Sequence, residues 1–509
     1  MSDFWTFPRR FIAILFVLLL TSPAFGQDQK KNVGKLTLAD SVVLALQNNL
    51  DVKNAFLDRI VQKFNLKVEE NKFYPQSSIA LSSKLNSNYS TNGRDTGANQ
   101  SNSYTASLLV PTGGTFSFTW DYSAAKTDFG QDTVYNPSWN LSFVQPLLKG
   151  GGIEGEGIKV ATASLRIARI NEEMNVLGLK STLTNIVNST IQAYRSYIQS
   201  LRQLEISKRS LAMAKKLYEI NKALVEAGRM AEVEIVQTEA DIANRELGIL
   251  QAENSLQSAR LALIQILNME RETLFEPIEE TEARVIPPSF EGALKIALNN
   301  RPDYLQVLKE VEVSRLNFVV AKRNRLWDLS LEGGTKRNLS GSSYGSTLES
   351  AGRLGKTDWN VGVRLTIPFR DLTIEQAYVS AKVAMEKSDL NLKKLGINIG
   401  IEVQNAIRDV EIKFKQMQLA KQATTLVQKK LEIEEEKLKV GRTTNFQLLS
   451  FQSDLVNAQV SELGAIIDYL NSLTNLDQIL GTTLMTWKIE VKREDEEVKL
   501  PNSEKKVAR

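Results

Sequence analysis

The chain has 509 residues, a formal net charge of +4, and neither cysteine nor histidine. The missing residue types exclude disulfide frameworks, zinc sites built on Cys or His, thiol nucleophiles and His-based catalytic triads, so no metal and no cofactor is expected. The charge is nearly balanced and no basic stripe with interleaved aromatic residues is present, so no nucleic-acid partner is expected either.

Residues 1–26 are predicted to be a secretory signal peptide. Arg9 and Arg10 supply a positive start, residues 11–20 are apolar, and small residues at 24–26 precede a cleavage point. The Arg pair leaves the twin-arginine route open, although the strongly apolar core favours ordinary secretion. That core is too short for a membrane helix, which needs about 20 residues. No other run could span a bilayer as a helix, so a membrane part would have to be a closed β-barrel.

The rest of the sequence repeats itself. Residues 45–51 (Ala-Leu-Gln-Asn-Asn-Leu-Asp) return at 297–303, and Gly228-Arg229 returns as Gly441-Arg442. We therefore predict two structural repeats, 27–286 and 287–487, each running helix, strands, long helix, tight turn, long helix. The turns fall near 228 and 441. Residues 488–509 form a charged tail that is expected to be disordered.

The strand segments, 76–146 in the first repeat and 326–369 in the second, alternate apolar and polar residues with a period of two. The apolar positions are Phe116, Phe118, Trp120 and Tyr122; Trp139, Leu141 and Phe143; Trp327, Leu329 and Leu331; and Trp359, Val361, Val363 and Leu365. This pattern is typical of membrane β-barrel strands, and aromatic residues at their ends form interfacial girdles. The predicted girdle is Trp120, Tyr122, Trp139, Trp327 and Trp359. A half-buried sheet in a soluble sandwich is the alternative.

The number of strands indicates an oligomer. Each repeat offers two strands in matching positions, and the first has two further candidates, around 104–110 and 115–124. Four or six strands cannot close a barrel alone, because single-chain barrels begin at eight. Several copies must therefore share one barrel; three copies would supply twelve or eighteen strands.

The long helices show heptad spacing, which marks helices that supercoil around a neighbour. The first repeat has one seam of Leu204, Leu211, Tyr218 and Val225 and another of Ile206, Met213, Ile220 and Ala227. The second repeat has Met417, Thr424, Leu431 and Leu438, and then Leu419, Leu426, Ile433 and Val440. Seams two residues apart point to nearly opposite sides of a helix. The pattern predicts a closed ring of helices, an α-barrel.

This organisation resembles the TolC-like outer-membrane efflux proteins. The resemblance is carried by residues 440–444 (Val-Gly-Arg-Thr-Thr), Asn457-Ala458, residues 143–148 (Phe-Val-Gln-Pro-Leu-Leu) and the two-fold repeat itself, and it covers about 36–481. It implies a homotrimer in the bacterial outer membrane, in contact with lipid, whose α-barrel extends into the periplasm. It also implies a periplasmic adaptor and an inner-membrane pump of the resistance-nodulation-division or ABC type.

The expected function is that of a passive exit channel in a tripartite efflux or type I secretion system, not an enzyme. The residues expected to form adaptor-docking and gating tips are Gly228, Arg229, Glu234, Gly441, Arg442, Thr443 and Thr444. The family's aspartates after the second tip are replaced here by Gln447 and Ser450. The arginines are alternatively solvated turn residues, and the glycines simple helix stops.

Two other classes of protein compete with the channel. A secreted structural or adhesive coiled-coil surface protein would explain the heptads and the signal peptide, but not the paired strands. A carboxylate enzyme such as a glycosidase would need two placed acidic residues in a pocket, whereas most carboxylates here fall on exposed helix faces.

Overall fold

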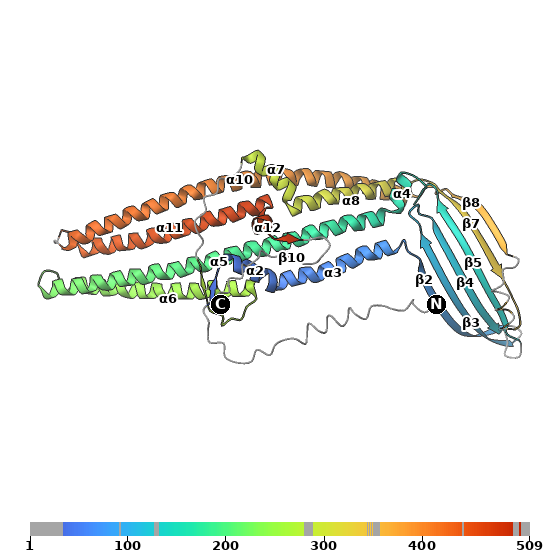
Figure 1. Cartoon of the computed structure of the whole chain (residues 1–509), viewed down its shortest axis with the longest axis horizontal. Helices are drawn as coiled ribbons and strands as arrows, with labels where there is room; N and C mark the ends of the chain where they lie inside the picture. The colour runs from blue at the N-terminus through green and yellow to red at the C-terminus, as the bar shows by residue number, and fades with distance from the viewer. Residues whose placement is uncertain are drawn as a thin grey trace, which may run out of the picture.

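The computed structural model describes residues 34–90, 93–126, 132–278, 289–343, 345, 347, 349, 357–439, 442–491 and 498–499. The predicted signal peptide and Gly441 lie outside these residues. The molecule is elongated: long helices run side by side along its axis, and a sheet stands at one end (Figure 1). No helix in the described ranges is long and apolar enough to cross a bilayer.

The described part of the first repeat contains short helices, four long strands, two three-residue strands and a helical hairpin. Its elements are β1 (Gly34–Leu36), α2 (Leu38–Asn48), α3 (Leu50–Asn71), β2 (Gln76–Ser90), β3 (Gly93–Leu109), β4 (Thr115–Lys126), β5 (Val134–Pro146), α4 (Glu156–Ala161), α5 (Ala163–Glu226), α6 (Val233–Leu267) and β6 (Phe275–Pro277). Strands β1 and β6 pair in parallel, which ties the start of the repeat to its end.

The second repeat has the same order with two strands. Its elements are α7 (Phe290–Asn300), α8 (Pro302–Asn324), β7 (Asp328–Asn338), β8 (Asp358–Thr366), α10 (Leu372–Lys439), α11 (Asn445–Leu480) and α12 (Thr483–Thr486), followed by β9 (Glu490–Val491) and β10 (Val498–Lys499). At 1.5 Å per residue, α5 and α10 are each roughly 100 Å long.

The repeated seven-residue motif forms the break between two helices in each repeat. In the first repeat, Asn49 ends α2 and its side chain accepts hydrogen bonds from the backbone amides of Asp51 and Val52, capping α3. In the second, Pro302 occupies the first turn of α8, where a missing N–H costs nothing. In each repeat the motif therefore ends one helix and begins the next.

All six long strands join one antiparallel sheet in the order β2-β3-β4-β5-β7-β8. The prediction of two extra strands in the first repeat is therefore confirmed, since β3 and β4 pair along their length with β2 and β5. Strand β5 pairs directly with β7, which joins the two repeats into a single wall. Strands β2 and β8 are its two edges.

The register places apolar and polar residues on opposite faces of the sheet. The apolar face consists of Ile79, Leu81, Leu85, Tyr104, Leu108, Phe116, Phe118, Trp120, Tyr122, Trp139, Leu141, Phe143, Leu329, Leu331, Trp359, Val361, Val363 and Leu365. The other face, here called the polar face, carries Ser, Thr and Asn residues together with Lys84, Asp121, Glu332 and Arg364. The predicted alternation is confirmed for the large apolar positions of β4, β5 and β8. On β3 the polar residues Gln100 and Asn102, and on β7 Thr335 and Arg337, also lie on the apolar face.

Strands β2 and β3 are longer than the rest of the wall. Strand β4 ends where Lys126 pairs with Ala98, whereas β2 and β3 continue pairing as far as Ser90 and Gly93. Beyond β4 they form a two-stranded ribbon, here called the outer ribbon. At about 3.3 Å per residue, its five pairs add roughly 16 Å to the sheet.

The helices form a layer that changes composition along the shaft. Beside the sheet the order is α3-α5-α8-α10, and towards the far end it is α6-α5-α11-α10, so two helical hairpins lie side by side (Figure 1). A core cluster of Leu217, Leu431, Leu438, Leu448, Leu449 and Leu455 joins both hairpins near their tips.

The heptad prediction for α10 is confirmed, with one seam inside the protomer and one outside. Leu431 is buried at 2 %, whereas Leu419, Leu426 and Ile433 are 65 %, 57 % and 58 % exposed. Exposed leucines at heptad spacing on a long helix need a partner outside the protomer.

The predicted disordered tail begins too early. Ile489 is only 5 % exposed and packs in a cluster with Leu179 and Leu183 of α5. Glu490–Val491 then pairs with Val498–Lys499. The high charge of the segment made it look solvated, but Ile489 and the partly buried Val491 pack against the shaft. Residues 492–497 and 500–509 lie outside the described residues.

Candidate functional site: the sheet wall and the helical tips

The predicted girdle residues occupy different depths on the apolar face. Trp120 and Trp139 are directly opposite each other on β4 and β5. Trp359 is 78 % exposed and pairs with Thr335, closer to the helices. Tyr122 is 6 % exposed within the protomer, with its ring near those of Trp120 and Tyr135. Within the protomer Tyr122 is therefore the least exposed of the predicted girdle residues in β4 and β8.

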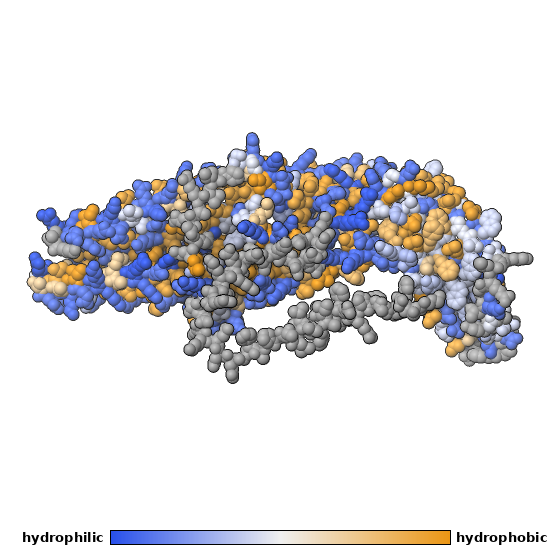
Figure 2. Space-filling model, in the orientation of Figure 1, coloured by the Kyte–Doolittle hydropathy of each residue, from blue (hydrophilic) through white to orange (hydrophobic). Residues whose placement is uncertain are grey.

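Trp327 precedes β7 at the opposite end of the apolar band. Ten residues further along the chain, Arg337 lies opposite Trp139. Ten residues span roughly 33 Å along a strand, or about 25 Å of height for a ~40° tilt. That height matches the apolar band of an outer-membrane barrel, about 25 Å. Figure 2 shows apolar colour on the part of the sheet next to the helices, while the far strand ends are pale or blue.

A tight joint connects the sheet to the shaft. The guanidinium of Arg323, near the end of α8, donates to the carbonyls of Leu148 and Gly151 at 2.9 and 3.1 Å. Gly151 has no room for a side chain, because a Cβ there would lie 2.6 Å from the carbonyl oxygen of Thr112. The glycine-rich segment is thus a close-packed connection in which strands become helices.

The two tips are exposed turns whose arginines are held only through their backbones. Gly228 adopts a left-handed backbone with φ of 71°, and the amide of Arg229 donates to Leu224 at 2.8 Å. The amide of Arg442 likewise donates to Lys437 at 2.9 Å. Neither arginine side chain has an ion pair within the described protomer. The proposed closure through Arg229 or Arg442 therefore has no contact inside one protomer.

Thr443 and Thr444 do make side-chain contacts at the second tip. The hydroxyl of Thr443 donates to Glu434 at 2.5 Å, and Lys437 donates to the same carboxylate at 3.0 Å. These two hydrogen bonds hold the pKa of Glu434 below its ordinary value. Thr444 caps α11 by accepting from the amide of Gln447 at 3.3 Å. The second tip is fixed by its own residues.

A buried polar cluster, here called the polar latch, joins the hairpins about two turns behind the tips. Asn221 of α5 donates to Thr238 of α6 at 2.8 Å and to Asn445 of α11 at 2.9 Å. The exposed fractions of Asn221, Thr238 and Asn445 are 0 %, 0 % and 2 %. Thr238 also donates to the carbonyl of Glu234, the predicted acidic tip residue. These buried hydrogen bonds favour one relative position of the helices, and the side-chain oxygen of Asn221 is buried without a hydrogen-bond partner among the described residues.

Sequence reasoning missed the latch and Glu434. The buried face of α5 runs through Ser210, Ala214, Leu217 and Asn221, between the two predicted seams. Because this face carries small and polar residues rather than a continuous row of large apolar ones, its helical spacing of three to four residues was not recognised in the sequence. An Asn spaced four residues after a buried Leu was the available signal.

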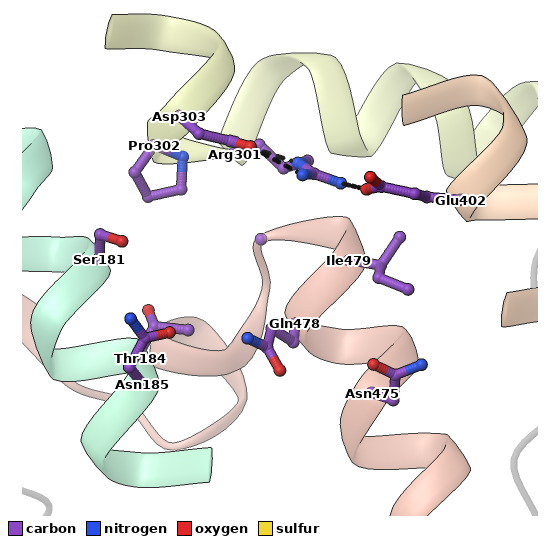
Figure 3. A pocket seen from close by; sticks show the side chains of 11 residues that line it. Ser181, Thr184, Asn185, Arg301, Pro302, Asp303, Glu402, Asn475, Gln478 and Ile479 are labelled. Atoms are coloured by element: carbon purple, nitrogen blue, oxygen red, sulfur yellow. Dashed lines mark hydrogen bonds and ion pairs between the residues drawn. The ribbon is translucent and has the colours of Figure 1, made fainter. Parts of the chain in front are cut away.

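A polar pocket of about 290 Å³ lies at mid-shaft, where α5 of the first repeat meets α8, α10 and α11 of the second. Figure 3 shows Arg301, Asp303 and Glu402 along one side of it. Arg301 donates to Asp303 at 2.7 Å and to Glu402 at 2.5 Å. Burial alone raises the pKa of Asp303, but the hydrogen bond and charge of Arg301 outweigh burial and leave the pKa below its ordinary value.

The lowered pKa predicts an acid-sensitive contribution to stability. A carboxylate with a depressed folded-state pKa stabilises the fold above its unfolded value, about 3.9, and loses this contribution as pH falls through the folded value. Asp303→Asn should therefore melt below wild type at pH 7, and the gap should narrow as the pH falls below the unfolded value. Glu310→Gln, an exposed change on the same helix, should leave no gap at any pH. Thermal melts of the purified channel at a series of pH values measure both variants; a gap that stays constant from pH 7 down through the acid range contradicts the assignment.

The described residues contain no group of three or more acidic side chains that could hold a metal ion. Their most prominent feature is a one-layer sheet with an apolar face, mounted on two helical hairpins. A coiled-coil rod at the cell surface has no need of such a sheet, so the adhesive alternative is not favoured.

The family model for outer membrane efflux proteins matches residues 113–269 and 293–482, more than half of the chain. No curated protein matches the chain in sequence.

Solved structures share the fold at low identity. CusC matches with a TM-score of 0.68 and 16 % identity over 90 % of this chain and 95 % of its own. The CmeC outer membrane channel of Campylobacter jejuni matches with a TM-score of 0.63 and 19 % identity over 90 % of each chain. The open-state MtrE outer membrane channel of Neisseria gonorrhoeae matches with a TM-score of 0.64 and 16 % identity over 90 % of this chain and 93 % of its own. The chain therefore belongs to the outer membrane efflux protein family, and it is an outer-membrane channel with a periplasmic extension rather than an enzyme.

Proposed function

We propose that three copies of this chain form one continuous duct from the periplasm through the outer membrane, as the exit part of a tripartite efflux or type I secretion system. The observation that carries this proposal is the sheet: it has an apolar face for lipid, a polar face for water, and two edges without partners in the described protomer. The exposed seam of α10 supplies the matching helical contact between copies.

The experiment starts from the protein extracted from outer membranes in detergent. We expect oligomers with the mass of a trimer that dissociate on heating, and ion conduction after reconstitution into planar bilayers. A monomer that stays in solution without detergent and does not insert into lipid would contradict the duct.

The tips are the proposed gate and the proposed docking surface for a periplasmic adaptor. Gly228, Arg229, Arg442, Thr443 and Thr444 lie at the turns of the hairpins, and we propose that Gly441 belongs to the same surface. The adaptor would connect the tips to an inner-membrane pump of the resistance-nodulation-division or ABC type. Exposed arginines with no ion pair among the described residues are available to an acidic or carbonyl-rich docking surface at little cost, since surface pairs are worth about 0–1 kcal/mol each.

Reversing the tip charges tests the docking surface. The double variant Arg229→Glu and Arg442→Glu should assemble normally, because neither side chain has an ion pair within the described protomer, and should lower efflux-dependent resistance several-fold by repelling the adaptor. Lys208→Glu, an exposed change on α5 away from the tips, is the matched control. Resistance equal to wild type in the double variant would count against docking through the arginines.

A further inference from the structure

The two edges of the sheet are long, apolar and open. Strand β2 pairs only with β3, and β8 only with β7, within the described chain. Leu81 and Leu85 on β2 are 74 % and 80 % exposed, and Trp359 and Val361 on β8 are 78 % and 70 % exposed. Unprotected edges of this kind pair with other chains unless they are covered. Lysine, proline and bulges, the usual protections, are nearly absent from these edges: β2 carries only Lys84, and β8 carries none of them.

The strand directions select one way of pairing. Each neighbouring pair in the sheet is antiparallel and the strand number is even, so β2 and β8 run in opposite directions. Placing β8 of one copy beside β2 of the next continues the antiparallel order. It also keeps all helical shafts on the same side, whereas antiparallel pairing of β2 with another β2 would send the two shafts in opposite directions. Head-to-tail pairing is the kind that closes into a ring.

The width of the sheet matches the width of the helix layer beneath it. Four helices, α3, α5, α8 and α10, pack side by side next to the sheet. At about 8–10 Å per helix they cover roughly 32–40 Å. Six strands spaced about 4.8 Å apart and tilted by ~40° cover roughly 38 Å, whereas four strands would cover only about 25 Å. Six strands per copy therefore continue the helical ring without a step in diameter.

From this match we infer that three protomers close an eighteen-stranded barrel, β8 edge to β2 edge, and that the β3–β4 hairpin is part of the barrel wall. The inference rests on the proposed trimeric duct and adds the number of strands in the barrel wall and the width of the barrel. The barrel would be roughly 36 Å across between backbones, against about 24 Å for twelve strands of the same tilt. The membrane segment is then as wide as the tunnel, so the size limit for cargo lies at the helical tips.

An electron cryomicroscopy reconstruction of the full oligomer in lipid nanodiscs tests the inference directly. We expect eighteen strands in the wall, six from each copy. A wall of twelve strands with residues 93–126 outside it, in an oligomer that still conducts ions, would overturn the inference and leave the duct intact. Failure to insert into lipid as an oligomer would overturn the duct itself.

Cysteine pairs give an independent readout, because the natural chain has no cysteine. Gly362→Cys on the polar face of β8, combined in turn with Ser78→Cys, Ala80→Cys or Ser82→Cys on the polar face of β2, should yield covalent trimers on oxidation for at least one combination. The pair Ser82→Cys with Ser142→Cys is the control. In the six-stranded order β2 and β5 lie three spacings apart, roughly 14 Å, too far for a disulfide. Efficient intramolecular bonding of the control pair would overturn the inference.

Discussion

Replacing Phe118 by Arg is expected to remove the channel from the outer membrane. Phe118 lies on the apolar face, opposite Leu141 and Ala106 on the neighbouring strands. An arginine facing lipid near the centre of a barrel costs about 2–4 kcal/mol. In a trimer the cost applies three times, which is comparable to the whole stability of many proteins. The measurement is the amount of heat-dissociable oligomer in outer-membrane fractions.

Thr119→Arg is the matched control for that experiment. Thr119 is the next residue on the same strand and belongs to the polar face, opposite Asn140 and Thr105. The same charge should be solvated there, so oligomer yield should stay close to wild type and only the ion selectivity should change. Equal loss of oligomer in both variants would show that the two faces have been assigned wrongly.

Breaking the polar latch is expected to open the tips. Asn221→Ala removes the donor to Thr238 and Asn445, whose buried polar atoms are then left with fewer partners. Such a loss costs about 1–3 kcal/mol per site, and 1.4 kcal/mol corresponds to a tenfold change in an equilibrium. In the proposed trimer, which has three latches, the ratio of open to closed channels should rise at least tenfold. Single-channel conductance in planar bilayers measures this ratio, and uptake of a large antibiotic reports it in cells.

Two further variants separate the latch from general damage. Lys222→Ala, an exposed change beside Asn221, should behave like wild type. Replacing all three latch residues together, by Asn221→Leu, Thr238→Val and Asn445→Leu, should restore closure in part, because removing every partner leaves no buried polar group unsatisfied. Closed channels in Asn221→Ala would rule out a gating role for the latch.

The strands and the outer seam could be predicted because each depends on a short period in the sequence. Trp359 and Val361 alternate with polar neighbours, and that alternation alone assigns the face. Leu419 and Leu426 repeat every seven residues, and their exposure on α10 follows from the second seam. The repeated Asn49 motif was predicted only as part of the internal repeat. The structure shows that it also separates two helices, α2 from α3 and α7 from α8, where the sequence pattern predicted a single helix.

Other features depended on contacts between segments far apart in the chain. Asn221 and Asn445 are 224 residues apart, and no local pattern shows that they touch. Tyr122 was assigned to the girdle from alternation, yet neighbouring aromatic rings bury it. The choice between four and six strands was open because β3 and β4 have no counterpart in the second repeat; only pairing with β2 and β5 decided it.

The outer ribbon of β2 and β3 should make this protein accessible to external reagents on intact cells. It rises past the end of β4, at the end of the sheet remote from the helices (Figure 1). A reagent that cannot penetrate the envelope, such as an antibody or a phage, would meet the ribbon before any other paired strand. Three such projections around one opening would offer a surface-displayed epitope, through which the channel could be counted or immobilised without breaking the cell.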